Sequence, residues 1–210
     1  MTAAAWGAVL VGTLGGGVPA PAAAQSGARD SVVYVLAPTS RFEVKTGTAG
    51  LFGFAGHEHL VRAQHPSGRI IYRPNSPADS RVEIVVAAES LEVLTPPDTA
   101  EIRKVTEAMR TEILRVDRYP VIRFASTTVT PTSEGLRVQG QLTLAGATRD
   151  VAAELRLDIA ADTLRATGRF SVKQTDFGIR PYRGGPGGTV RVADRVIIEL
   201  DAVGLRAPDP

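Results

Sequence analysis

The chain has 210 residues, of which 43% are hydrophobic and 22% charged, and its formal net charge is +2. This composition supports a globular domain with a real core and argues against disorder. The small, scattered positive charge and the 5% aromatic content exclude the basic, aromatic-rich surface typical of nucleic-acid binders. The absence of cysteine excludes disulfides, thiol chemistry and Cys-based metal sites.

The N-terminus has the pattern of an export signal. Residues 1–28 carry no charged side chain, and the apolar run AAAWGAVLVGTLGGGV is followed by PAPAAAQ. An apolar run before an A-x-A site predicts a signal peptide over 1–24, with cleavage near Ala24. The alternative is a membrane anchor, but the run is shorter than the roughly 20 residues that span a bilayer. We therefore expect a periplasmic or secreted protein with no stable membrane span.

From Ser31 onward the dominant pattern is alternation of apolar and polar residues with a period of two. This pattern predicts antiparallel strands with one face toward the core and one toward water. The predicted strands are 32–36, 41–46, 67–73, 81–88, 121–129, 136–144, 151–159, 164–172 and 196–203. In two of them the alternation assigns the inward face to Leu136, Val138, Leu142, Leu144, Val151, Ala153, Leu155, Leu157 and Ile159.

One segment, 98–116, breaks this period. Its apolar residues follow helical spacing, and Asp98 with Glu101 resembles a capping box. The apolar stripe consists of Ile102, Val105, Met109, Ile113 and Val116. We expect one amphipathic helix that packs on the sheet. Eight to nine strands with one inserted helix predict an all-β fold, an antiparallel barrel or sandwich, with no second domain.

The three histidines of the chain lie close together, in the pattern H-x-H-x5-H formed by His57, His59 and His65. On an extended segment residues i and i+2 point the same way, so His57 and His59 could chelate one divalent metal, with His65 as a third ligand. No Asp or Glu is placed to orient these imidazoles. Two alternatives stay open, namely a polar role at the rim of a binding site and a purely structural role.

Five segments, in order, carry a resemblance to a known family: YVLAPTSRFEVKTGTAG (34–50), SRVEIVVAAESLEV (80–93), DRYPVIRFAST (117–127), GQLTLAGATRDV (140–151) and GRFSVKQTDFGI (168–179). Together they resemble the YceI-like family of exported lipid-binding proteins, and the resemblance extends over 34–203. It implies an eight-stranded, lipocalin-like antiparallel barrel, here assigned to residues 31–204. Some members hold a polyisoprenoid or a related long-chain amphiphile inside the barrel.

Two segments depart from the family pattern. HEHLVRAQHPS (57–67) stands between two strands as an unusual connection, as in a branch of the family that carries G-H-x-H at this position. RPYRGGPGGTVRVADRV (180–196) is longer and richer in glycine than the usual connection.

The function implied by the resemblance is binding of a small apolar ligand, with no catalysis and no required cofactor. The bound molecule would be an isoprenoid lipid, and the metal site is the alternative. Residues expected to line the interior are Phe42, Phe52, Phe54, Leu142, Leu144, Leu155, Leu157, Phe170 and Ile198, with His57 and His59 at the rim. A barrel filled by its own side chains, serving as an envelope stress or interaction module, would show the same alternation. The sequence does not specify the oligomeric state.

Overall fold

The computed structural model describes residues 31–49, 58–94, 99–184 and 190–208. The strands are β1 (Val32–Leu36), β2 (Arg41–Ala49), β3 (His59–Ala63), β4 (Ser67–Tyr72), β5 (Arg81–Ala87), β6 (Leu91–Val93), β7 (Val121–Thr132), β8 (Gly135–Leu144), β9 (Ala147–Ile159), β10 (Thr163–Lys173), β11 (Arg183–Gly184) and β12 (Val190–Arg206). The helix α2 (Thr99–Ala108) runs into the single π-turn η5 (Met109–Ile113), and short 3-10 turns are η3 (Pro77–Asp79), η4 (Ala88–Ser90) and η6 (Gln174–Phe177).

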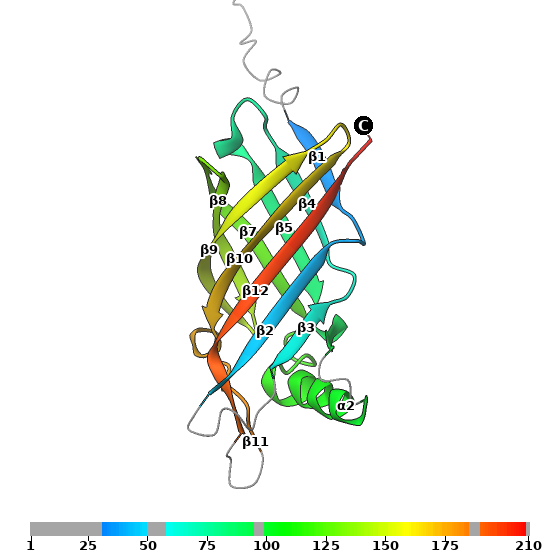
Figure 1. The fold of residues 1–210 in the computed structure, drawn as a ribbon, viewed down its shortest axis with the longest axis vertical. Coiled ribbons are helices and arrows are strands. Elements are labelled where there is room, and N and C mark those ends of the chain that lie inside the picture. The colour runs from blue at the N-terminus through cyan, green and yellow to red at the C-terminus, as the bar shows by residue number, and fades with distance from the viewer. Residues whose placement is uncertain (1–30, 50–57, 95–98, 185–189, 209–210) are drawn as a thin grey trace, which may run out of the picture.

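The strands close into an antiparallel barrel (Figure 1). Neighbours around the ring are β1, β4, β5, β7, β8, β9, β10 and β12, and pairing of β1 with β12 closes it. Closure leaves no free sheet edge in this ring. The predicted fold, an eight-stranded antiparallel barrel with one inserted helix, is confirmed.

Two parts of the barrel wall are built differently. The continuous wall consists of β7, β8, β9, β10 and β12, each a single long strand. The broken wall consists of β1 to β6, in which each position of the ring is shared by two short strands. For example, β1 and β2 both pair with β12, β1 at Gly204–Arg206 and β2 at Arg191–Asp201.

In the broken wall, local hydrogen bonds fix the chain at the turns where it leaves one short strand and enters the next. Between β1 and β2, the Ser40 hydroxyl accepts from the Val203 N–H at 3.0 Å and donates to the Val203 carbonyl at 3.1 Å. Between β3 and β4, His65 has a positive φ of 50°, and the Gln64 N–H donates to the Ser90 carbonyl. At these two breaks, such bonds satisfy backbone groups that leave the regular strand pairing.

Three strands were missed from the sequence. Residues 59–63, predicted to lie in a connection, form β3, which pairs with β2 and β6. The polar His59 lies on the inward side with Val61 and Ala63, and so it hides the apolar alternation. The strands β6 and β11 contain only three and two residues, too few to show a period.

The predicted helix is confirmed in type and shorter at its C-terminal end. Helical structure stops at Ile113, and the Val116 N–H turns back to the Arg110 carbonyl. The apolar stripe of the helix packs against the lower part of the barrel core, as expected. No helix in the described residues is long and apolar enough to cross a membrane.

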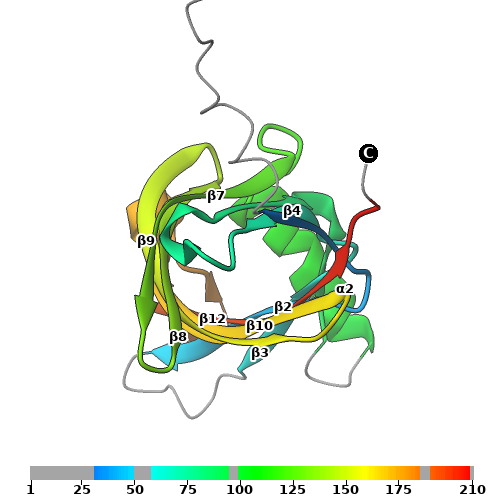
Figure 2. The same cartoon turned by 90° about the horizontal axis from the view of Figure 1, so that it is seen from above.

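The core is divided between the two ends of the barrel. The upper cluster of buried residues is centred on Tyr34, Leu36, Ile70, Leu164, Ala166 and Ala202, and the lower cluster includes Val61, Leu91, Leu142 and Val196 under the helix. Figure 2, seen along the barrel, shows the strands surrounding a central space. Ile159, expected to face inward, is 43% exposed because it is the last residue of β9, at the rim beyond the packed interior.

Candidate functional site

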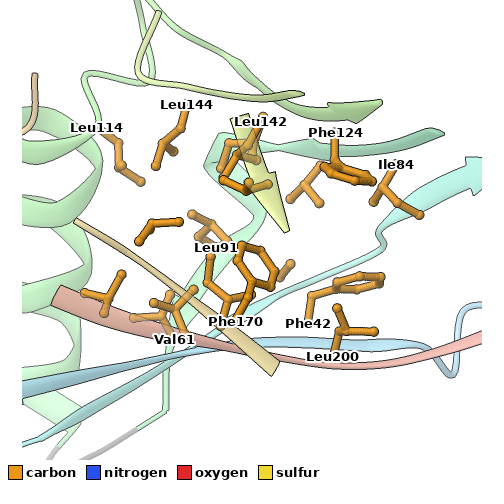
Figure 3. A pocket seen from close by; sticks show the side chains of 18 of the residues that line it. Phe42, Val61, Ile84, Leu91, Leu114, Phe124, Leu142, Leu144, Phe170 and Leu200 are labelled. Carbon is orange, nitrogen blue, oxygen red and sulfur yellow. The ribbon is translucent and has the colours of Figure 1, made fainter. Parts of the chain in front are cut away.

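The barrel encloses a cavity of about 1030 Å³. Inward side chains from both walls line it (Figure 3). Residues of α2 and η5 complete the lining. This volume is at the upper end of the range usual for ligand pockets. The interior is therefore hollow, and the alternative of a barrel filled by its own side chains does not describe this molecule.

Most of the residues expected in the interior do line this cavity. They are Phe42, Leu142, Leu144, Leu155, Leu157, Phe170 and Ile198. Phe52 and Phe54 lie outside the described residues. In Figure 3 the labelled rings of Phe42, Phe124 and Phe170 lie in the same space as the labelled leucines.

Other lining residues were not singled out from the sequence. Phe124 and Ile84 lie on predicted strands, where the period of two could have placed them inside. Val61 and Leu91 lie on β3 and β6, which were not predicted, so no alternation pointed to them.

Glycines on the inner face leave room for large side chains close to the wall. A Cβ added at Gly140 would stand 2.6 Å from Phe124 Cζ, so the phenyl ring lies directly on the backbone of β8. A Cβ at Gly168 would stand 2.7 Å from Leu155 Cδ2. A strand glycine commonly marks such close approach. Phe124 and Leu155 thus lie close against the wall.

The polar lining residues gather at the lower end of the barrel, where Figure 1 shows α2 and β11. We call this end the mouth. Its polar residues are Thr46, His59, Lys104, Glu107, Thr111, Glu112, Gln174, Tyr182, Arg183 and Arg191. Farther up, the lining is almost entirely aliphatic and aromatic, with Ser80 as a buried exception. The cavity is therefore amphipathic along its length.

The two described histidines do not come together. His59 lines the mouth, and its backbone N–H donates to Thr46 Oγ1 at 3.1 Å. His65 is exposed beyond the other end of β3, roughly 20 Å away at about 3.3 Å per residue. His57 lies outside the described residues. Within the described ranges no three His, Asp or Glu side chains could share a metal ion, so the metal site stays a prediction that depends on His57.

A carboxylate anchors the turn next to the mouth. The Thr175 N–H and hydroxyl donate to Asp194 at 2.9 and 2.8 Å, and these hydrogen bonds lower the pKa of Asp194. The Gln174 side chain donates to the Ala193 carbonyl at 2.8 Å. Together they fix η6 to β12. Asp194 does not line the cavity, so its role is to hold the mouth in shape.

A model of the YceI-like domain matches residues 35–204, nearly the whole described part of the chain. The chain belongs to the YceI-like family. The resemblance inferred from the five sequence segments is thus confirmed over the same span. Whether this YceI-like chain falls in the G-H-x-H branch depends on the segment around His57 and stays a prediction.

Solved structures share the fold at low sequence identity. Burkholderia cenocepacia BcnA is 16% identical with a TM-score of 0.63, and the match covers 78% of this chain and 95% of BcnA. A polyisoprenoid binding domain from Saccharophagus degradans, implicated in plant cell wall breakdown, is 13% identical with a TM-score of 0.60, covering 84% and 99%. The Campylobacter jejuni YceI protein is 14% identical with a TM-score of 0.54, covering 71% and 85%. Among proteins with curated descriptions, none is similar enough to this chain to count as a match.

Proposed function

We propose that this protein binds an apolar or amphiphilic small molecule, an isoprenoid-type lipid, and sequesters or carries it in the cell envelope. The observation that carries the proposal is the hollow, apolar cavity of about 1030 Å³ with polar groups at one end. The polyisoprenoid binding domain of Saccharophagus degradans, which shares the fold, supports the choice of lipid class.

The shape of the cavity favours a long chain over a compact molecule. Lining residues on β12 run from Arg191 to Ala202, which corresponds to roughly 30 Å along the barrel for a tilted strand. Transfer of a lipid tail from water to this lining is favoured by about 25 cal/mol for each Å² of apolar surface removed from water. Every added unit of an extended tail therefore adds affinity until the cavity is full.

Binding of this kind needs no bond to be made or broken. The tail lies against Phe42, Phe124 and Phe170, and the head group lies at the mouth, where the His59 imidazole is a polar neighbour. The envelope location rests on the export signal expected over residues 1–24.

The test is mass spectrometry of an organic extract of the purified protein, with a matched pair of variants. Ala153 lines the cavity, and Ala152 is its neighbour on the opposite face of β9. Ala153→Phe places a ring in the path of the tail, whereas Ala152→Phe adds the same ring outside. We expect a co-purifying lipid in the wild type and in Ala152→Phe, and at least a tenfold lower yield from Ala153→Phe.

Two results would contradict the proposal. One is an extract without lipid from a wild type that also fails to bind added long-chain prenyl alcohols. The other is an equal lipid yield from both variants, because a ligand inside the barrel must distinguish the two faces of β9.

A further inference from the structure

Several arginines on the barrel wall are neutralised by ion pairs. Arg137 pairs with Glu154 at 2.8 Å, Arg165 with Asp201 at 2.6 Å and Arg62 with Glu43 at 2.6 Å. These cross-strand pairs neutralise parts of the outer surface. Other wall arginines, such as Arg69 and Arg169, form no ion pair with a described residue, and what distinguishes the mouth is that three such arginines lie in one short segment.

The three arginines belong to one segment, which we call the mouth ribbon: residues 180–184 and 190–192, including β11 and the start of β12. Arg180, Arg183 and Arg191 are all exposed, and none forms an ion pair with any residue that the structure describes. Between Gly178 and Ala193 the sequence holds these three arginines and no Asp or Glu. The segment is therefore a local source of uncompensated positive charge.

The pairing of β11 with β12 concentrates this charge. Arg183 and Arg191 are direct cross-strand partners, and like charges in that position repel. An anionic surface beside the ribbon would relieve the repulsion. Both arginines also line the cavity at this end, so the charge lies beside the polar part of its lining.

An aromatic residue accompanies the arginines. Tyr182 is 39% exposed, lies next to Arg183 in the chain and lines the cavity at the same end. Tyrosine is enriched at membrane interfaces because its ring is apolar and its hydroxyl prefers water. Across the mouth, α2 and η5 contribute Lys104 together with Glu107 and Glu112, so the uniformly cationic side is the ribbon.

We propose that the mouth ribbon docks this end of the barrel onto an anionic lipid bilayer. Its three arginines are exposed at the very end of the barrel, two of them on strands, where they suit a broad charged surface better than the head group of one enclosed ligand. Docking in this orientation would let an apolar tail pass between bilayer and cavity without crossing water. The proposal goes beyond ligand binding, and its test does not require a ligand.

The test measures partition of the purified protein onto lipid vesicles by co-sedimentation. One set contains equal parts of phosphatidylglycerol and phosphatidylcholine, and neutral vesicles of phosphatidylcholine alone control for hydrophobic adsorption. The ribbon variant combines Arg180→Gln, Arg183→Gln and Arg191→Gln. The matched wall variant combines Arg137→Gln, Arg156→Gln and Arg165→Gln, which removes the same charge from exposed positions on β8, β9 and β10.

We expect the wild type and the wall variant to bind the anionic vesicles within about threefold of each other. Each basic side chain near an anionic surface contributes about fivefold, so the ribbon variant should bind up to about 100-fold more weakly. Binding of the wild type should also fall steeply with salt, a measurement that needs no variant.

Three outcomes would overturn the docking proposal: no preference of the wild type for anionic over neutral vesicles, equal loss in both variants, or full binding by the ribbon variant. The lipid extract of the ribbon variant keeps the two proposals apart. A ribbon variant that no longer sediments with the anionic vesicles but still co-purifies with lipid supports both docking and ligand binding. A wild type that binds vesicles and holds no lipid supports docking alone.

Discussion

The continuous wall and the broken wall face the same cavity but hold their strands in place by different means. In the continuous wall, β9 has 13 residues and β12 has 17, and ladder hydrogen bonds run along most of their length. In the broken wall, β3 has five residues and β6 has three, and side chains replace parts of the ladder. The continuous wall thus consists of long, regular strands, and the broken wall of short strands joined by local hydrogen bonds.

The helix compensates for the shortness of β6. Among the described strands β6 pairs only with β3, and α2 packs beside it. The Arg110 guanidinium donates from Nη2 to the Leu91 carbonyl at 3.2 Å, which satisfies an acceptor on this short strand. The helix therefore acts as part of the wall, and its stability is coupled to the lower end of the cavity.

A matched pair of glycine substitutions should show the largest difference in stability between the two walls. In the continuous wall, a Cβ at Gly168 would stand 2.4 Å from the Glu154 carbonyl oxygen, a backbone atom that cannot move without disturbing the sheet. In the broken wall, the only atom of the described residues that a Cβ at Gly47 would meet is Ala193 Cβ, at 3.7 Å. Gly168→Ala should cost about 2 kcal/mol of unfolding free energy, as overpacking does, and Gly47→Ala should change it by no more than about 0.5 kcal/mol.

Urea denaturation of both variants measures the difference. An equal loss of unfolding free energy at the two positions would mean that the two walls are equally tightly packed, and it would contradict the difference inferred here. Similar slopes of unfolding free energy against urea are needed as a control that both variants unfold from the same compact state.

The two walls also differ in how far the sequence predicts them. Long strands such as β8 and β10 show several cycles of alternation, which identifies both the strand and its inward face. In β3 the inward set is only His59, Val61 and Ala63, so one polar residue is enough to obscure the period. Short strands held by tertiary contacts leave little local signal, and so the broken wall could be predicted only in part.

For the site, the sequence predicts which residues face inward and does not predict the space between them. The same alternation serves a filled and a hollow barrel, since the volume depends on how Phe124 lies on Gly140 and how Leu155 lies beside Gly168. Those contacts join different strands at distances that periodicity does not contain. The sequence likewise shows the three arginines of the mouth ribbon. That two of them line the cavity follows only from the folded structure.

The second substitution tests the contribution of the helix to the broken wall. Arg110→Met keeps the length of the side chain and removes the hydrogen bond to the Leu91 carbonyl; it also removes Nε, a buried atom with no partner among the described residues. The two effects oppose each other, so global stability should fall by no more than about 1 kcal/mol. Local opening should increase, since a tether between helix and strand is lost.

Amide hydrogen exchange checks this expectation. Amides of β6 and η5 should exchange several-fold faster in Arg110→Met, and those of the β8–β9 hairpin should be unchanged. Arg103→Met, at an exposed position on α2, is the control and should leave both regions as in the wild type. Uniform acceleration throughout the barrel would show that the helix is not a separate part of the wall.

The smallest expected effect concerns stability at acidic pH where β12, the last strand of the continuous wall, pairs with β2 of the broken wall. We call this pairing the seam. Hydrogen bonds from Arg165 at 2.7 and 2.6 Å lower the pKa of Asp201, with the charges of Arg165 and of Arg41 on β2 contributing in the same direction. A carboxyl whose pKa is lowered by folding stabilises the folded state above its ordinary pKa of 3.8, and this stabilisation is lost as the pH falls through the lowered value. Because the pair is partly exposed to solvent, we expect Asp201→Asn to cost about 0.5–1 kcal/mol at pH 7 and progressively less below pH 4.

Unfolding free energies of the wild type and the variant across this pH range measure the effect. Asp150→Asn on β9 is the control, since Asp150 forms no ion pair with a described residue. A constant gap between wild type and Asp201→Asn at all pH values would mean that packing at the seam, and not the charge of Asp201, accounts for the loss.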